Sequence, residues 1–269
     1  RPPRATRFSD TTLFRSSYHS INESDSSAVW LMMTWIFSFE TETWTKERIK
    51  SFLQAVPKNK LMLLDYYCEN KEVWKTTDAY FGQPFIWCYL GNFGGNTMLA
   101  GNLAEIEKRI DTAFQNAGSN ICGIGSTLEG LDANPVIYNY VFEKVWSNGS
   151  TNIQQWINSW ADSRCGTIDS NCRKAWQLLI QKIYTSPAVL GQATLTNARP
   201  CLTGNGNWTT NPHVDYDNKD LLQAWKFLLD TKANKRQSYQ YDIVNIGRQV
   251  LGNYFAEVRD QFTKSYQEK

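Results

Sequence analysis

The sequence predicts an α/β fold with about four parallel strands in the first part of the chain, followed by an all-α fold. Two observations lead to this prediction. Short apolar runs bounded by turn residues alternate with segments of helical periodicity up to about residue 130, whereas only helical periodicity follows residue 135. Alternation of strands and helices is typical of a parallel sheet or barrel.

Four apolar runs are candidate strands. Each is short and is followed by polar or glycine residues, as expected for a strand that is buried on both faces of a parallel sheet. They span residues 28–35, 60–65, 84–90 and 121–125. Helical patterns precede and separate them at residues 8–25, 45–55, 72–77 and 102–117.

The second part of the chain carries amphipathic patterns that predict helices. They span residues 136–145, 153–161, 173–184, 219–229 and 242–268, with a polar loop at 197–217. We therefore expect a strand-containing domain at 1–145 and an α-helical domain at 146–269. Cys165 and Cys172 are close enough along the chain to form a disulfide that closes a turn, but spacing alone does not establish the pair.

Net charge and the spacing of Cys and His residues exclude some classes of function. The 28 Lys and Arg residues nearly balance the 26 Asp and Glu residues, and a net charge of +2 gives no basic field for nucleic acid. The six cysteines form no Cys-x-x-Cys pair, and His19 and His213 form no His-Glu-x-x-His motif. We expect no metal and no other cofactor, so catalysis falls to carboxylates. No apolar run reaches the ~18 residues of a membrane span.

Aromatic and amide side chains near the candidate strands suggest carbohydrate binding. The chain has 11 Trp residues, and aromatic faces stack against sugar rings. Trp35 and Trp87 are each either core residues or walls that stack on a ligand. Asn92 opens an Asn-Phe-Gly-Gly-Asn turn whose amides can bond sugar hydroxyls. Tyr241 and Asp242 open the last helical pattern, where Asp242 is expected to be the N-cap.

Three carboxylates follow candidate strands, where ligand sites of parallel α/β folds form. Glu129 lies in Gly-Ser-Thr-Leu-Glu-Gly after the fourth run. Its position fits a catalytic carboxylate or, more often, one that caps a turn or helix. Asp65 and Glu69 follow the second run and are either acid/base groups or groups that orient a neighbour by hydrogen bonding.

Several runs together resemble one family, the alpha-N-acetylglucosaminidases of glycoside hydrolase family 89. The runs are Trp30-Leu-Met-Met-Thr-Trp35, Gly82-Gln-Pro-Phe-Ile-Trp-Cys88, Asn92-Phe-Gly-Gly-Asn96, Leu99-Ala-Gly-Asn-Leu103, and Leu128-Glu-Gly130 followed by Asn134. The resemblance implies a (β/α)8 TIM-type barrel, of which this chain supplies the second half, and a C-terminal helical domain. It also implies a retaining exo-acting glycosidase that removes terminal α-linked N-acetylglucosamine from glycans such as heparan sulfate.

The resemblance also implies site residues. Glu129 matches the family's nucleophile, and Trp35, Trp87 and Asn92 match positions in or beside the pocket, with Asp65 and Tyr241 as further candidates for substrate binding. Gly91 departs from the family, whose members often carry His before the Asn-Phe-Gly-Gly run.

The family's acid/base Glu belongs to an Asn-Glu motif that is absent from residues 1–27. We therefore expect the N-terminal half of the enzyme, as a separate or missing chain, to be a partner, and this chain alone to be inactive. Four barrel strands leave two open edges, which favour association, including homo-oligomers. The alternative is a non-catalytic carbohydrate-binding or scaffold fragment.

The compartment is expected to be lysosomal or secreted, or periplasmic if the protein is bacterial. Sequons at Asn22, Asn148 and Asn207 are candidate glycosylation sites in a secretory compartment, although such triplets also arise by chance.

Overall fold

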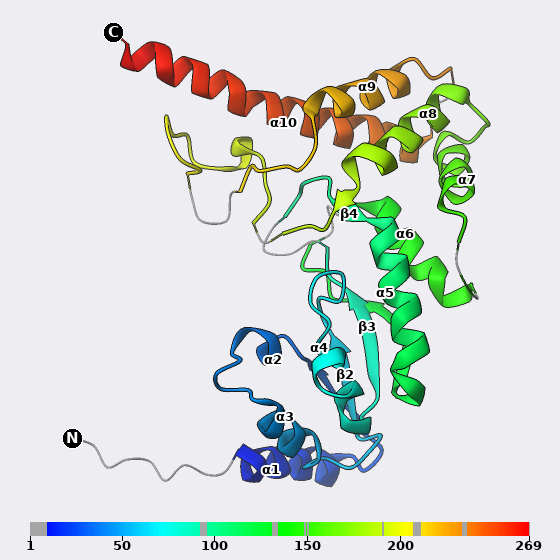
Figure 1. Cartoon of the computed structure of the whole chain (residues 1–269), viewed down its shortest axis with the longest axis vertical. Helices are drawn as coiled ribbons and strands as arrows, with labels where there is room; N and C mark the ends of the chain where they lie inside the picture. The colour runs from blue at the N-terminus through cyan, green and yellow to red at the C-terminus, as the bar shows by residue number, and fades with distance from the viewer. Residues whose placement is uncertain are drawn as a thin grey trace. The chain divides into compact units, whose positions relative to one another are not determined.

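The computed structural model describes residues 10–91, 96–130, 134–147, 149, 151–189, 191–206, 211–232 and 236–268 (Figure 1). It divides into two compact units. The first comprises the chain up to Leu90 together with Lys108–Thr127, and the second comprises Gly91–Glu107 and Leu128–Lys269. A parallel four-stranded sheet with helices is followed by a helical part, so the predicted fold class is confirmed. The boundary expected at 145/146 stays a prediction.

The first unit alternates strands and helices, as the apolar runs predicted. Its elements are α1 (Asp10–Ser24), β1 (Trp30–Met33), α2 (Ile36–Phe39), α3 (Lys46–Leu53), β2 (Leu61–Asp65), α4 (Val73–Thr76), the 3-10 turn η1 (Ala79–Gly82), β3 (Phe85–Tyr89), the 3-10 turn η2 (Gly118–Asn120) and β5 (Ile121–Ser126). Helix α5 (Leu103–Asn116) contributes residues to both units.

The four strands form one parallel sheet in the order β1-β2-β3-β5. Leu63 lies opposite Phe85, and Trp87 lies opposite Ile124. Because all strands run the same way, their carboxyl ends meet at one edge of the sheet, which is where parallel α/β folds place their sites.

The two faces of this sheet differ in burial. On one face Leu63 and Phe85 are fully buried, and Phe85 stacks against Trp74 of α4. On the other face Leu31 and Met33 of β1 are 59% and 47% exposed. The expectation that every strand is buried on both faces is therefore wrong for β1, and it is also wrong for β5, none of whose residues is buried. Within the first unit no described helix covers these two side chains.

A left-handed turn connects α4 to β3. Residues 78 to 82 all have positive φ, from 48° at Asp78 to 94° at Gly82, although four of them are not glycine. Such a conformation costs about 1–2 kcal/mol per non-glycine residue. The turn places the Tyr80 ring in the core, where its hydroxyl donates to Thr34 Oγ1 at 3.0 Å. The sequence gives no sign of this turn.

The second unit is mainly helical. Its elements are α6 (Pro135–Glu143), the 3-10 turn η3 (Lys144–Trp146), α7 (Ile153–Cys165), α8 (Ser170–Leu178), the π-helical turn η4 (Leu179–Ile183), the 3-10 turn η5 (Leu195–Asn197), α9 (Asn218–Leu229) and α10 (Gln237–Gln267). It also contains a short antiparallel pair, β4 (Gly101–Asn102) with β6 (Thr185–Ser186).

Two expectations for the second unit are decided by the structure. Cys165 at the end of α7 and Cys172 in α8 form a disulfide, so the pairing that spacing left open is present. Helix α10 begins at Gln237 after the N-cap Arg236, so the expectation that Asp242 caps this helix is wrong. Asp242 is instead a buried residue of the second helical turn.

The close approach of β3 and β5 predicts different costs for two glycines of β5. A Cβ atom on Gly125 would lie 2.9 Å from Ile86 Cγ2 and 3.3 Å from Cys88 Sγ, whereas a Cβ atom on Gly123 meets nothing within 4 Å. We expect Gly125→Ala to destabilise the intact protein by about 1–3 kcal/mol through overpacking. Gly123→Ala is the matched control and should leave the melting temperature unchanged or slightly raised. Equal melting temperatures for the two variants would contradict this packing.

Candidate active site

Glu69 fixes the carboxyl end of β3. Its side chain is buried, and both carboxylate oxygens accept the backbone N–H of Leu90 at 3.1 Å. Leu90 immediately precedes Gly91 and the turn that begins at Asn92. Residues 92–95 lie outside the described residues. The alternative that Glu69 orients a neighbour is therefore the one that the structure supports.

Three hydrogen bonds fix the carboxyl end of β5. Ser126 Oγ and the Thr127 backbone N–H both donate to the Tyr89 carbonyl, at 3.0 and 3.1 Å. Thr127 Oγ1 donates to the Tyr66 carbonyl at 2.5 Å. The backbone two residues before Glu129 is thus held by β3 and by the loop after β2.

Glu129 itself lies in a bend between β5 and α6, and its side chain is exposed. It does not cap α6, because the N-cap of that helix is Asn134. An exposed carboxylate that follows a fixed strand end is what a nucleophile requires, since it must reach a substrate while its backbone stays in place.

Asp65 ends β2 and is fully buried. Its oxygens accept the backbone N–H groups of Val73 and Trp74 at 3.3 and 2.9 Å, at the start of α4. Burial raises the pKa of Asp65 to about 7, against the opposing effect of these hydrogen bonds. Asp65 supports the start of α4, which favours its orienting a neighbour by hydrogen bonding, and its expected role in substrate binding stays a prediction.

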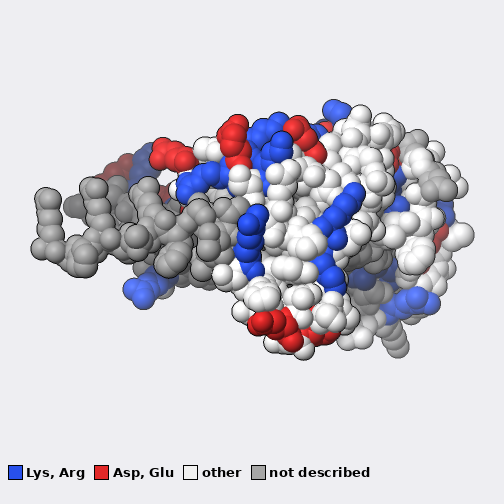
Figure 2. All heavy atoms as spheres, turned by 90° about the horizontal axis from the view of Figure 1, so that it is seen from below, with Lys and Arg blue, Asp and Glu red and all other residues white. Residues whose placement is uncertain are grey.

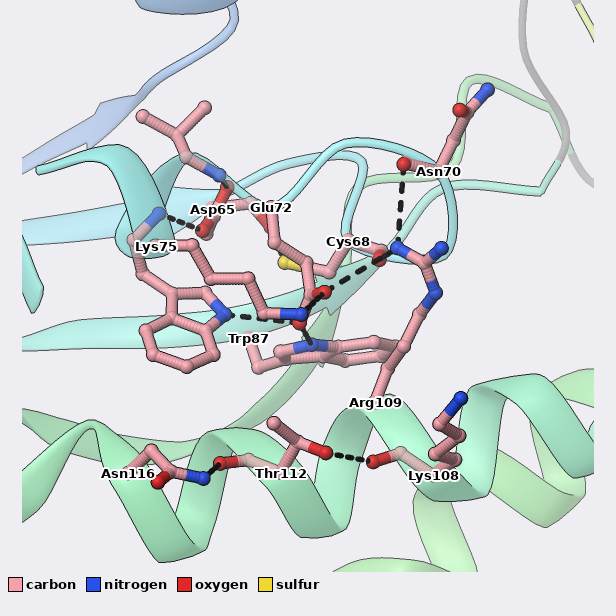
Figure 3. Close-up of polar contacts among 12 residues, drawn as sticks. Asp65, Cys68, Asn70, Glu72, Lys75, Trp87, Lys108, Arg109, Thr112 and Asn116 are labelled. Atoms are coloured by element: carbon pink, nitrogen blue, oxygen red, sulfur yellow. Dashed lines mark hydrogen bonds and ion pairs between the residues drawn. The ribbon is translucent and has the colours of Figure 1, made fainter.

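Glu72 is the centre of a buried polar cluster that the sequence did not indicate (Figure 3). Its carboxylate accepts the indole N–H of Trp74 at 3.0 Å and that of Trp87 at 3.4 Å. Lys75 Nζ and Arg109 Nη1 lie 2.5 and 3.3 Å from it. Trp87 is fully buried, which favours the core alternative, and its role beside the substrate stays a prediction. Figure 3 shows Arg109 reaching this cluster from α5, which a local motif could not reveal.

Trp35 remains accessible just after β1. Its side chain is 43% exposed, and its ring lies 6.5 Å from that of Phe39. Its carbonyl accepts hydrogen bonds from Ser38 N, Ser38 Oγ and Phe39 N, which fix the turn that carries it. The geometry suits a stacking residue, and that role stays a prediction.

Tyr241 belongs to the second unit and borders a hollow of about 620 Å³. The hollow is lined by Leu128, Pro135, Tyr138, Phe142, Arg164, Gln237, Ser238 and Tyr241. Leu128 is the residue before Glu129, so the segment that carries Glu129 and the start of α10 meet at this hollow. Sequence patterns had placed neither α6 nor Arg164 beside Tyr241.

The remaining predicted sites are only partly described. Asn22 lies in α1, where its Oδ1 accepts from the Tyr18 hydroxyl at 3.3 Å, and its glycosylation stays a prediction. Asn148 and Asn207, like Asn92, lie outside the described residues.

Neither a metal-binding group nor a membrane-spanning helix occurs among the described residues. Across the described part of the chain, no group of three His, Cys, Asp or Glu residues could hold a metal ion. No helix among the same residues is long and apolar enough to cross a membrane. Figure 2 shows both signs of charge on the face seen from below, together with a broad area of uncharged residues.

The raised pKa of Asp65 predicts a pH dependence of stability. Between about pH 4 and pH 7 the folded state keeps the Asp65 proton, whereas the unfolded state, with a pKa near 3.8, has released it. The free energy of unfolding should therefore fall as the pH rises through this window. Asp65→Asn removes this contribution, so the melting temperature of the wild type relative to the variant should decrease from pH 4.5 to pH 7. Parallel pH profiles would exclude a raised pKa.

Two family models cover nearly the whole chain. The TIM-barrel domain of alpha-N-acetylglucosaminidase matches residues 2–148, and the C-terminal domain of the same family matches residues 156–269. Human alpha-N-acetylglucosaminidase is 30% identical over 252 residues, which are 91% of this chain and 34% of the human protein. The chain thus spans about a third of the length of this relative.

Solved structures of a family 89 glycoside hydrolase from Clostridium perfringens share the fold. The complex with PUGNAc has 22% identity and a TM-score of 0.82, and it matches 97% of this chain and 29% of that one. The complex with GlcNAc-alpha-1,4-galactose has 21% identity and a TM-score of 0.81. From the parallel sheet, the helical second part and the two matched domains, we conclude that this chain belongs to the alpha-N-acetylglucosaminidase family, with part of the TIM barrel and the helical domain that follows it.

Proposed function

We propose that this chain is part of a retaining exo-α-N-acetylglucosaminidase in which Glu129 is the nucleophile. One observation carries the proposal most directly. Glu129 is an exposed carboxylate placed two residues beyond the hydrogen-bonded end of β5. Asp65, Glu69 and Glu72, the other carboxylates near strand ends, are buried and engaged by backbone or indole N–H groups.

A retaining mechanism assigns a definite step to Glu129. Its carboxylate attacks the anomeric carbon while a second carboxyl, about 5 Å away, protonates the leaving oxygen. The resulting glycosyl-enzyme ester is then hydrolysed by a water that the second group deprotonates, and N-acetylglucosamine leaves with its α configuration retained. The role proposed for Trp35, taken by itself, is to stack against a sugar ring.

We propose that the second carboxyl and the remaining barrel strands come from a part of the protein outside these residues. Leu31 and Met33 support this arrangement, because both are large apolar side chains that β1 leaves exposed. An unpaired parallel edge strand with an apolar face requires cover. The relative's greater length leaves room for such a part.

The proposed substrates are glycans that end in α-linked N-acetylglucosamine, such as heparan sulfate. The proposed location is lysosomal or secreted. Both proposals rest on family membership rather than on a particular contact.

Replacing the nucleophile gives the first functional test. Glu129→Ala in the intact protein should lower kcat on an aryl α-N-acetylglucosaminide by about a thousandfold or more, because no covalent intermediate can form. Azide should partly restore turnover and give the β-glycosyl azide, since it attacks from the face that the carboxylate vacates. Glu42→Ala, which removes another exposed carboxylate, is the control and should keep full activity. Unchanged activity of Glu129→Ala would refute the assignment.

The need for a second barrel half gives a separate test. This chain alone should release nothing from the same aryl substrate, and co-expression with the N-terminal part should restore hydrolysis. Binding of N-acetylglucosaminides without hydrolysis by the intact protein would support the alternative, a carbohydrate-binding protein. Hydrolysis by the isolated chain would show that its own residues contain both carboxyls.

A further inference from the structure

A side chain ties the end of β5 to a strand that is not its neighbour. β3 lies between β2 and β5, and adjacent strands are about 4.8 Å apart, so the backbones of β2 and β5 are too far apart for a hydrogen bond. Thr127 Oγ1 nevertheless donates to the carbonyl of Tyr66, the residue after β2, at 2.5 Å. This bond therefore reaches over the carboxyl end of β3.

The Tyr66 carbonyl is a fixed acceptor. Tyr66 is 5% exposed, and the residue before it, Asp65, is fully buried. Two residues after Tyr66, the backbone N–H of Cys68 donates to the Cys88 carbonyl of β3 at 3.1 Å. Because the chain is held on both sides of Tyr66, its carbonyl restrains the side chain that donates to it.

Packing alone does not set the end of β5. None of its six residues is buried, and Gly123 and Gly125 have no side chain that could pack. Ser126 Oγ and the Thr127 backbone N–H both donate to one atom, the Tyr89 carbonyl oxygen. Two bonds to one acceptor fix a distance but restrict direction less than bonds to separate acceptors. The Thr127 hydroxyl supplies the bond to a second acceptor.

The direction in which the chain leaves Thr127 matters for chemistry. Thr127 is the last residue of the first unit, and Glu129 follows it by two residues, which span at most about 7 Å. A nucleophile must lie in line with the anomeric carbon, and a displacement of about 1 Å can cost about 100-fold in rate. A restraint at Thr127 therefore acts, through the chain, on the carboxylate of Glu129.

We propose that Thr127 is a positioning residue for the nucleophile. Its hydroxyl, bonded to the Tyr66 carbonyl, sets the direction of the segment that carries Glu129, and it touches no substrate. The inference rests on the proposed function and adds to it the group that orients the attacking carboxylate.

The first variants change only the Thr127 hydroxyl. Thr127→Val replaces it with a methyl group of similar size, whereas Thr127→Ser keeps it. In the intact protein, Thr127→Val should lower kcat on an aryl α-N-acetylglucosaminide by about 10- to 100-fold, because the carboxylate is no longer held in line. Thr127→Ser should keep kcat within about threefold of the wild type.

Binding of the sugar is measured in parallel, because a positioning role and a general loss of structure affect it differently. The inhibition constant of N-acetylglucosamine, the released sugar, should stay within about twofold of the wild type in both variants, since Thr127 touches no ligand. The loss in Thr127→Val should therefore appear in kcat and not in ground-state binding.

Thr77→Val is the matched control. Thr77 is buried, and its hydroxyl also donates to a backbone carbonyl, that of Val73, at 2.9 Å. This variant should lower the melting temperature about as much as Thr127→Val, because each leaves a carbonyl without its donor. Its kcat should stay within about twofold of the wild type.

The positioning role would be overturned by wild-type kcat in Thr127→Val, by an equal loss of kcat in Thr127→Ser or Thr77→Val, or by a parallel loss of N-acetylglucosamine binding. Thr127→Ala repeats the comparison without a β-branched side chain. Failure of both Thr127→Val and Thr127→Ala to fold would show that the hydroxyl serves the fold alone.

These results are separate from a failure of the proposed function. An inactive Glu129→Ala variant together with a fully active Thr127→Val variant would leave the nucleophile in place and remove only the positioning role. A wild-type intact protein that hydrolyses no α-N-acetylglucosaminide would instead refute the proposed function.

Discussion

The pairing of β3 on both of its sides is the constraint on which the first unit depends. β3 hydrogen-bonds to β2 on one side and to β5 on the other, and Phe85, Trp87 and Tyr89 are fully buried. Two sets of hydrogen bonds form at its carboxyl end. Glu69 accepts the backbone N–H of Leu90, and the Tyr89 carbonyl accepts hydrogen bonds from Ser126 and Thr127. The position at which β5 ends and the segment that carries Glu129 begins therefore depends on the packing of β3.

Carboxylates near the strand ends divide into those that hold the structure and one that is open to solvent. Asp65 supports the start of α4, Glu69 fixes the end of β3, and Glu72 binds two indoles and two cations. Burial without such partners would cost several kcal/mol for each charge, so these groups are committed to the fold. Glu129 carries no such burial, and for that reason it is the carboxylate that we assign to chemistry.

The sequence predicted the elements well because their signals are local. Apolar runs marked β1, β2, β3 and β5 to within a few residues, and helical periodicity marked most of the helices. Burial was harder to foresee, since Trp87 and Asp65 occupy positions that suit a ligand site but face the core. Asp is a residue type that often caps helices, which is why the sequence suggested that role for Asp242. Its burial is explained only by its partner Arg164, 78 residues earlier.

Long-range and strained features escaped sequence reasoning for physical reasons. Glu72 meets Arg109 across 37 residues of chain, and no motif encodes that distance. The left-handed turn at residues 78 to 82 contains only one glycine, at its end. Its composition therefore does not predict positive φ angles for the other four residues. Tertiary contacts such as the buried Tyr80 hydroxyl bond to Thr34 compensate for that local cost.

Covalent trapping tests the central claim most directly. The intact protein would be incubated with a 5-fluoro-α-N-acetylglucosaminyl fluoride, a reagent class that slows hydrolysis of a glycosyl-enzyme, and then digested and sequenced by mass spectrometry. A retaining mechanism with Glu129 as nucleophile predicts one added fluorosugar on the peptide that contains Glu129, attached to that carboxylate. A label on another residue would contradict the account, and so would steady turnover of the reagent with no covalent adduct at Glu129.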